Sequence, residues 1–342
     1  MGDFLKSFVF TALAMLFVSC GDEDDGKRFL PTPSGQPGEV VIKCSKGFWA
    51  SNYGDTLQRM LKTPVHGLPQ RESLFDLHHA TDNTFSRVFK TFGNILILEV
   101  DEGRFTKPEL KVERNVWAQR QAVVRLTASS RKELGESLME NMDKIIEILN
   151  KAEANRIAKK HKDLGSEKTN QKINELLGIK LYTPKDAYLA HEDSNAVWIR
   201  VERTKREGGV EHQISQGILL LKTPYTSLEQ LNDYAIYNLL DSALQELIPG
   251  PVDDSYMKID EVNMDVRFEQ VNYRGKYALE MTGLWRMHGY MMGGPWYALH
   301  IVDDENNRLI SAFGYVYAPQ FSKREYRREV EAVINSITIN NE

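Results

Sequence analysis

The stretch SAFGYVYAPQFSKREYRREVEAVINSI, residues 311–337, decides the expected fold, because it changes from a strand pattern to a helix pattern. Its first residues, up to Tyr317, favour a β-strand. Ser322 and Glu325 then form a Ser-x-x-Glu capping box, which is typical of a helix start. Behind the box, apolar side chains recur at helical spacing at Tyr326, Val330, Val333 and Ile337. The helix therefore has one face to bury against a sheet.

The same strand-to-helix pattern occurs twice more. AVVRLTASSRKELGESLMENMDKIIEIL, residues 122–149, carries its box at Ser130 and Glu133. GILLLKTPYTSLEQLNDYAIYNLLDSAL, residues 217–244, carries its box at Ser227 and Gln230. Three such units imply layers of helix on sheet. We therefore predict an α+β protein with antiparallel and mixed sheets packed by capped amphipathic helices, arranged as two α/β sandwich domains.

The N-terminal domain is predicted over residues 39–165. EVVIKCS opens it as a strand, GDTLQRMLK favours a helix, and Ile95–Leu98 predicts a strand covered on both faces. The helix after Ser130 continues past Leu149, and we expect its basic end to face solvent or a partner. Gly165 opens the segment that separates the domains.

The C-terminal domain is predicted over residues 173–342. Its first strand bends at Pro184, and Gly208-Gly209 joins two further strands as a hairpin. Long antiparallel strands follow. Their predicted turns lie at Arg274-Gly275, Gly293-Gly294-Pro295 and residues 303–307.

The N-terminus carries a different signal. The apolar run Phe8–Val18 is too short to cross a bilayer, which needs about 20 apolar residues. It has the length of the apolar region of a secretory signal peptide, here predicted over residues 1–19. After Cys20, an acidic and then Pro/Gly-rich segment over residues 20–38 predicts a solvated tether.

FVSC, residues 17–20, resembles the bacterial lipobox, with Phe17 where leucine is usual. The resemblance implies cleavage before Cys20 and attachment of acyl chains, such as palmitate, that anchor the protein in a membrane. Acids directly after this cysteine resemble the surface-export signal of Bacteroidetes-type lipoproteins. We therefore expect an outer-membrane lipoprotein, either surface-exposed or on the periplasmic leaflet.

Composition narrows the function classes. The 43 Lys and Arg residues against 48 Asp and Glu give a net charge of −5, and no basic face stands out, so nucleic-acid binding is not expected. With Cys20 lipidated, Cys44 has no disulfide partner, and its strand-like context predicts a buried, inert thiol.

The polar clusters predict no catalytic residues, no metal site and no cofactor. His78-His79 would point apart on a strand and diverge on a helix, and they lack a metal-ligand motif, so a surface loop is expected there. Asp253-Asp254 and residues 303–305 lie in turn contexts without the spacing of a calcium loop. No Gly-x-Ser-x-Gly elbow or phosphate-binding loop occurs.

The densest aromatic stretch, GLWRMHGYMMGGPWYALH, is the one candidate binding patch. If it forms a hairpin, alternate side chains face the core. The others then form an exposed tip that binds an envelope protein, a peptide or a glycan. The candidate residues are Trp285, His288, Tyr290, Met291, Met292, Trp296 and Tyr297.

Two resemblances extend beyond local motifs. RFLPTPSGQPGEV, FGNILILEV, NVWAQRQAV and YMMGGPWYALHI make the chain similar to an uncharacterised Bacteroidetes-type lipoprotein family, a domain of unknown function. From about residue 173, GIKLYTPKDA, TPYTSLEQLNDYAIYNLL and the spacing of Tyr326 to Ile337 resemble, loosely, the PsbP-like α+β sandwich. The second resemblance implies an accessory or scaffolding role.

These observations favour a lipid-anchored envelope protein with a non-catalytic binding or accessory role. Two alternatives stay open: an envelope hydrolase whose site is assembled from scattered residues, and a structural subunit with a large flat interface. A hydrolase predicts a cleft with converging polar groups of shifted pKa. A binding module predicts an exposed aromatic patch instead.

Overall fold

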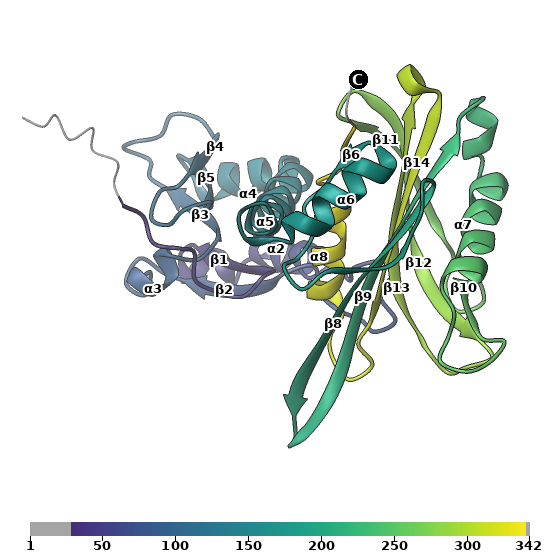
Figure 1. Cartoon of the computed structure of the whole chain (residues 1–342). Helices are drawn as coiled ribbons and strands as arrows, with labels where there is room; N and C mark the ends of the chain where they lie inside the picture. The colour runs from purple at the N-terminus through teal and green to yellow at the C-terminus, as the bar shows by residue number, and fades with distance from the viewer. Residues whose placement is uncertain (1–28, 340–342) are drawn as a thin grey trace, which may run out of the picture.

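Two large β-sheets organise the computed structural model, which describes residues 29–339 of the chain (Figure 1). The predicted signal peptide and Cys20 lie outside the described residues. The predicted α+β class is confirmed, since helices pack on both sheets. Within the described range, no helix has the length and apolar character needed to span a membrane.

The first domain is a five-stranded mixed sheet with strand order β2-β1-β3-β5-β4. The first four strands in this order are parallel, and β4 runs antiparallel to β5 at the edge. The elements are β1 (Glu39–Lys43), α1 (Lys46–Trp49), α2 (Asn52–Leu61), β2 (Asp76–Ala80), α3 (Arg87–Lys90), β3 (Asn94–Val100), β4 (Glu109–Arg114), β5 (Ala122–Ala128), α4 (Arg131–Glu140) and α5 (Met142–Leu164).

Strand β3 is buried on both faces, which is what its continuous apolar run predicts. Leu96 and Leu98 pack in the cluster that includes the apolar faces of α2, α4 and α5. Ile95 and Ile97 pack in a smaller cluster on the opposite face. The first domain therefore has an apolar layer on each side of its sheet.

The second domain is a strongly extended antiparallel sheet with the order β10-β12-β13-β14-β9-β8-β7, in which β11 also pairs with β12. Its elements are α6 (Glu167–Leu177), β6 (Ile179–Lys180), β7 (Tyr188–Glu192), β8 (Ala196–Glu207), β9 (Val210–Pro224), the 3₁₀ helix η1 (Leu228–Leu231), α7 (Asp233–Leu247), β10 (Tyr256–Asp260), β11 (Arg267–Tyr273), β12 (Lys276–His288), β13 (Gly293–Asp303), η2 (Asp304–Asn306), β14 (Arg308–Tyr317), α8 (Arg324–Ile334) and β15 (Thr338–Ile339).

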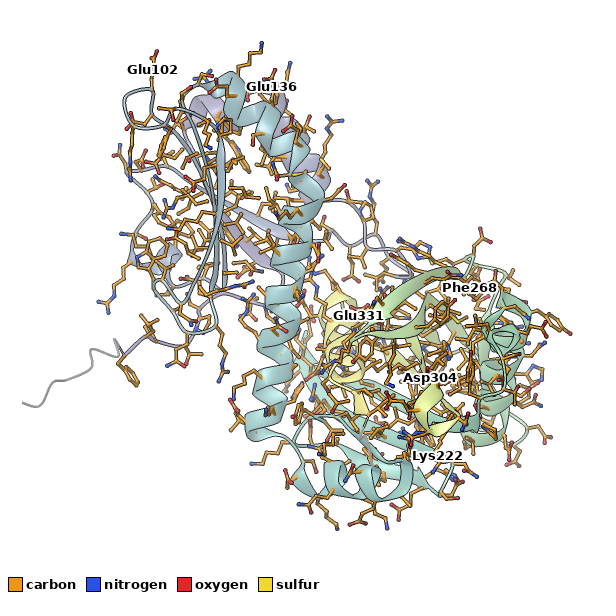
Figure 2. The ribbon with its side chains drawn as sticks, turned by 90° about the horizontal axis from the view of Figure 1, so that it is seen from above. Glu102, Glu136, Lys222, Phe268, Asp304 and Glu331 are labelled. Atoms are coloured by element: carbon orange, nitrogen blue, oxygen red, sulfur yellow. The ribbon has the colours of Figure 1, made fainter. Side chains whose placement is uncertain are left out.

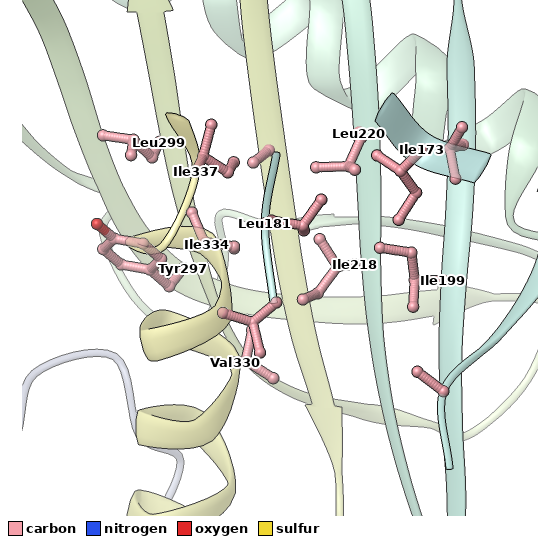
Figure 3. Packing of buried hydrophobic residues seen from close by; sticks show 14 of the residues in the cluster. Ile173, Leu181, Ile199, Ile218, Leu220, Tyr297, Leu299, Val330, Ile334 and Ile337 are labelled. Atoms are coloured by element: carbon pink, nitrogen blue, oxygen red, sulfur yellow. The ribbon is translucent and has the colours of Figure 1, made fainter. Parts of the chain in front are cut away.

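Helices cover both faces of this large sheet. Helix α7 packs on one face through Ile236, Leu240 and Leu244 (Figure 1). Helices α6 and α8 pack on the other, where Ile173 and Val330 belong to the cluster in Figure 3. Side chains alternate between the faces along each strand, so the large sheet supports two separate cores.

Helix α8 lies between the two domains. One side packs on the large sheet, and the other contacts α5 of the first domain (Figure 2). Arg324 Nη2 lies 2.6 Å from Asp76 Oδ2, and His161 Nε2 lies 3.2 Å from Glu329 Oε1. The basic end of α5 therefore faces the second domain.

The three predicted capping boxes are formed to different extents. Ser130 accepts the Glu133 N–H at 3.3 Å and starts α4. Ser227 and Gln230 form a full box, but it caps η1, and α7 starts after Asn232. The long helix predicted after Ser130 is interrupted at Asn141, whose backbone leaves the helical region.

The prediction of a third capping box, Ser322 with Glu325, is wrong. Helix α8 begins at Arg324 without a side-chain cap from its own segment. Glu72 of the first domain accepts the backbone N–H groups of Lys323 at 2.6 Å and Arg324 at 2.9 Å. A residue distant in sequence therefore supplies the cap, and Glu325 pairs with Arg324 instead.

Residues 30–37, the last part of the predicted tether, are hydrogen-bonded to the first domain. Ser34 N donates to Thr91 O at 2.8 Å, and Gln119 N donates to Pro31 O at 2.9 Å. This part of the chain is fixed on the domain surface, which shortens the span available to a free tether.

Candidate binding pocket and interdomain cleft

The structure divides the predicted aromatic patch between the two faces of the large sheet. Trp285 and Trp296, 1% and 0% exposed, point into the core under α7. Tyr297, 4% exposed, lies on the opposite face. Met291 is 97% exposed at the tip, beside the exposed His288 and Tyr290, whereas Met292 is half-buried.

The turn in this hairpin is placed differently from the prediction. Gly293 to Pro295 belong to strand β13 and pair with β12. The connection is formed by residues 289–292, where Gly289 adopts a positive φ of 74°. The shift by four residues changes which side chains stand at the tip.

A pocket of about 350 Å³ lies on the α7 face of the large sheet, beyond the C-terminal end of α7. Trp285, Tyr290 and Met292 of the predicted patch line it. Sequence reasoning missed the residues that come from β8, β9, β14 and the segment after α7. These include Trp198, Arg200, Gln213, Ser215, Ile248, Pro249, Tyr315 and Tyr317.

One wall of this pocket is aromatic. The rings of Trp285 and Tyr315 meet edge to face, with centroids 5.6 Å apart. Tyr317 lies 6.4 Å from Trp285 on the same wall. Trp198 Nε1 donates to the Tyr315 hydroxyl at 3.2 Å, so each of these rings is held by a ring or hydrogen-bond neighbour.

Two glycines make room for these rings. Gly217 on β9 lies opposite Tyr315, and a Cβ there would lie 2.4 Å from the Tyr315 ring. Gly294 lies opposite Trp285, and a Cβ there would lie 3.2 Å from Trp285 Nε1 and 2.0 Å from Val316 O. Trp285 Nε1 donates to this same carbonyl at 3.2 Å. The glycines therefore position the aromatic wall.

Polar side chains lie beside the aromatic rings on the same face of the sheet. The Arg200 guanidinium stacks over Trp198 at 5.0 Å and donates through Nε to Glu202 Oε1 at 2.9 Å. Glu202 also accepts from Ser215 Oγ at 2.8 Å and Gln213 Nε2 at 2.9 Å. The carboxylate thus orients three donors along β8 and β9.

Burial also affects the titration of the Tyr315 hydroxyl in this pocket. Burial raises the pKa of the Tyr315 hydroxyl, so the phenol stays protonated at neutral pH. Since the Tyr315 oxygen accepts the Trp198 bond, its proton is available for a ligand acceptor. The pocket combines an apolar surface with convergent hydrogen-bond groups, the usual character of a ligand site.

A second hollow, of about 380 Å³, lies between the domains and is called here the interdomain cleft. The 63–66 segment of the first domain forms one side, and β11, β12, β13 and α8 form the other. Tyr297, the predicted patch residue on the far face, contributes to its lining. Its polar residues include His66, Arg267, Glu280 and Glu331.

Shifted pKa values gather in this cleft. Burial raises the pKa of Glu280, and the nearby Glu331 and Glu269 add to the effect. Burial raises the pKa of Tyr297 well above its ordinary value. Burial lowers the pKa of His66, with Arg267 and Arg327 acting in the same direction. The molecule therefore has both an aromatic pocket and a polar cleft with shifted pKa values.

The other polar candidates have structural partners. The surface loop expected at His78-His79 is wrong, since both lie half-buried on β2. His78 Nε2 lies 2.9 Å from Glu39 Oε1, and His79 stacks on Trp49 with centroids 4.5 Å apart. Asp303 pairs with Arg308 at 2.6 Å and with Lys276 at 3.2 Å. Within residues 29–339, no three His, Cys, Asp or Glu side chains are grouped as a metal site.

Cys44 is a buried thiol of the first domain. It is 2% exposed and belongs to the apolar cluster beneath α2, α4 and α5. Burial raises its pKa to about 12, so the thiolate is not formed at neutral pH.

Comparison with known proteins gives two family matches. Residues 166–336, half of the chain, match a domain of unknown function (DUF4837). Residues 33–162 match another domain of unknown function (DUF8532). No curated protein matches the chain. The matches cover the two sheets separately and meet between α5 and α6.

Proposed function

The chain belongs to the family described as a domain of unknown function (DUF4837), and we propose that it is a lipid-anchored envelope protein that binds a glycan in its aromatic pocket. The anchor is the lipid on Cys20. The expected location is the outer membrane, on the cell surface or the periplasmic leaflet, and the role is non-catalytic.

One observation carries the binding proposal: the pocket places aromatic rings and polar side chains next to each other on one face of the large sheet. A sugar ring has an apolar face of C–H groups and an edge of hydroxyl groups. The apolar face matches rings such as Tyr317, and the hydroxyls match donors such as Arg200 and Gln213. A volume of about 350 Å³ lies in the range of small-ligand pockets.

The anchor proposal is supported by sequence. The run Phe8–Val18 ends at a small residue and Cys20, and an acidic segment follows. Each buried methylene of an attached acyl chain contributes about 0.8 kcal/mol to membrane binding. Pro31, eleven residues after Cys20 in sequence, is hydrogen-bonded to the first domain, so the first domain would lie close to the membrane surface.

Glycan binding is tested with the full-length protein on an array of N-acetylglucosamine and neutral hexose oligomers. The proposal expects binding to at least one oligomer class and at least tenfold weaker binding by Arg200→Gln. Arg104→Gln, which alters an exposed arginine of the first domain, is the matched control. Absence of binding, or equal binding by Arg200→Gln, would contradict the proposal.

The anchor is tested with Cys20→Ala in the native host. This variant should stay unprocessed or become soluble, because the cysteine provides both the cleavage signal and the acyl acceptor. Cell fractionation and the apparent mass report the result. A variant found in the membrane fraction at the mature size would show that the lipidation hypothesis is wrong.

A second candidate function, an envelope hydrolase, is supported by the interdomain cleft. Glu280, with its raised pKa, has the character of a proton donor, and Glu331 offers a second carboxyl group. A hydrolase acting there predicts that Glu280→Gln abolishes release of soluble product from labelled envelope material. Product release that is unchanged in this variant would exclude Glu280 as the acid.

A further inference from the structure

The aromatic pocket has two ends that differ in chemistry. Its lining residues come from strands that are spread across the large sheet, and in the strand order β9, β14 and β13 lie between β8 and β12 (Figure 1). Arg200 and Gln213 line the pocket at the β8 end. Met287 lines it at the other end, on β12 beside β10. A ligand that fills the pocket therefore meets different groups at its two ends.

The end beside β10 is built from apolar side chains. Met257 on β10 pairs with Met287 on β12, so these two side chains lie next to each other on one face of the sheet. The Met257 N–H donates to the Ile248 carbonyl at 3.0 Å, which holds the segment after α7 beside them. The apolar residues that line this end include Ile248, Pro249, Met257, Met287 and Met292.

The connection between β12 and β13 contributes one methionine to this end. Met292 is half-buried and lines the pocket, and its carbonyl accepts the Met287 N–H at 2.8 Å. Its neighbour Met291 is 97% exposed and is not a lining residue. Unbranched thioether side chains adapt their shape to an apolar group, so Met287 and Met292 suit a small apolar substituent of a ligand.

The β8 end is polar, and the charge of its arginine is compensated. Arg200 Nε donates to Glu202 Oε1 at 2.9 Å, and Ser215 Oγ donates to the same oxygen at 2.8 Å. Because the Glu202 carboxylate neutralises the guanidinium, this end suits uncharged polar groups, such as sugar hydroxyls, better than an anion.

A hydroxyl donor lies between the two ends. Tyr315 on β14 lines the pocket, and its oxygen accepts a hydrogen bond from Trp198 Nε1 at 3.2 Å. The Tyr315 proton can therefore be donated to an acceptor of the ligand. The Tyr315 ring meets the Trp285 ring with centroids 5.6 Å apart, and Trp285 lies on the same strand as Met287. The donor is thus close to the methionine end.

We propose that the pocket selects sugars that carry an acetamido group, as N-acetylhexosamines do, a specificity that rests on the glycan binding proposed above. The acetamido group is uncharged and combines a methyl group with a carbonyl acceptor. The methyl group packs on Met287 and Met292, and the carbonyl oxygen accepts from Tyr315. The ring hydroxyls then meet Arg200 and Gln213. A plain hexose has a hydroxyl in place of the acetamido group, which leaves the methionine end without an apolar partner.

The test compares two sugars that differ only in this substituent. The full-length protein is titrated calorimetrically with chitotriose, a trimer of N-acetylglucosamine, and with cellotriose, the glucose trimer of the same linkage. Chitotriose should bind at least tenfold more tightly, because only its acetamido groups reach both the methionines and the Tyr315 hydroxyl.

The neighbouring methionines offer a variant and its matched control. Met292→Gln keeps the length of the side chain and replaces its apolar end by an amide, so it should weaken chitotriose binding at least fivefold and leave cellotriose binding unchanged. Met291→Gln makes the same change at a 97% exposed position and should bind both trimers like the wild type. Tyr315→Phe removes the donor and should also reduce the preference for chitotriose.

Equal binding of the two trimers, tighter binding of cellotriose, or an unchanged preference in Met292→Gln would overturn acetamido selection and leave glycan binding itself intact. If Met292→Gln does not fold, the wild-type comparison and Tyr315→Phe still decide the outcome. Absence of binding by every oligomer would contradict the glycan site as well. Arg200→Gln tests that site separately, since it should weaken the binding of both trimers.

Discussion

Gly217 is the residue on which the shape of the aromatic pocket depends. Gly217→Ala would place a methyl group 2.4 Å from the Tyr315 ring, so the ring has to move. We expect a loss of about 1–3 kcal/mol in the free energy of unfolding, the usual cost of overpacking. Urea denaturation measures it. Gly103→Ala, where the Cβ meets only an ordinary contact at 3.5 Å, is the control and should be near neutral.

His300 makes the stability sensitive to mild acid. It is fully buried, lies 2.8 Å from Ser311 Oγ through Nδ1, and has a pKa lowered by burial to about 3. The unfolded state takes up a proton near pH 6.5, whereas the folded state stays neutral, so stability is complete above pH 6.5 and is lost as the pH falls.

We therefore expect the free energy of unfolding to fall with a His300 contribution approaching about 1.4 kcal/mol per pH unit below pH 6. His300→Asn cannot take up this proton and should have a smaller slope. Denaturant unfolding at pH 6.5, 5.5 and 5.0 measures the slopes. Equal slopes for both proteins would contradict the assignment.

At the scale of elements, helix α8 depends on a cap from the other domain. Glu72 accepts two N–H groups at the start of α8, so Glu72→Gln should weaken both bonds. Loss of a side-chain cap costs about 0.5–2 kcal/mol, and we expect a decrease in this range in thermal or urea unfolding. Glu109→Gln, on the exposed edge strand β4, is the control. A decrease equal to the control would mean that Glu72 does not stabilise α8.

Local sequence patterns predict which segments form helices and strands. They predict less well the residues at which these helices and strands begin and end. The hairpin turns at Gly208-Gly209 and Arg274-Gly275 are formed with positive φ at both residues, a conformation that glycine favours and that Arg274 adopts although it is not a glycine. The turn after β12 was placed four residues late, because Gly293 and Gly294 are needed inside β13 next to Trp285. The local pattern predicts Ser322 as the cap of α8. The true cap, Glu72, lies far away in the sequence, and no local pattern predicts it.

For the whole molecule, α8 makes the two domains one unit. Arg324 donates to Asp76 at 2.6 Å and to the Ser73 carbonyl at 2.7 Å, both in the first domain. Arg324→Ala leaves these acceptors without the guanidinium, so we expect the unfolding of the first domain to separate from that of the second. Hydrogen exchange under mild urea should then be faster in β1, β3 and β5 than in β13 and β14.

The control for this coupling is Arg59→Ala, whose side chain donates a hydrogen bond to Thr56 in its own helix. It should leave the exchange rates of both sheets as in the wild type. If Arg324→Ala also changes both sheets to the same extent, the domains remain coupled through other contacts and the role given to Arg324 is wrong.

The candidate sites show the limit of sequence reasoning at this scale. The aromatic density of the β12–β13 hairpin predicts a binding patch there, and four residues of this hairpin, Met287 among them, line the pocket. Trp198 and Arg200 on β8 complete the pocket, and they are brought near Tyr315 by pairing of β8 and β14 with β9. The interdomain cleft is lined by His66 and by residues between 267 and 335. These residues are too far apart in sequence for a local spacing pattern to predict that they meet.

The central claim, a glycan site in the aromatic pocket, is tested most directly by calorimetric titration of the full-length protein with the oligomer that binds on the array. Tyr317→Ala removes a ring of the pocket wall, and Tyr234→Ala removes a tyrosine that is 80% exposed at the start of α7. The account predicts at least tenfold weaker binding for Tyr317→Ala and wild-type binding for Tyr234→Ala. Equal affinities for all three proteins would place the glycan elsewhere and contradict the account.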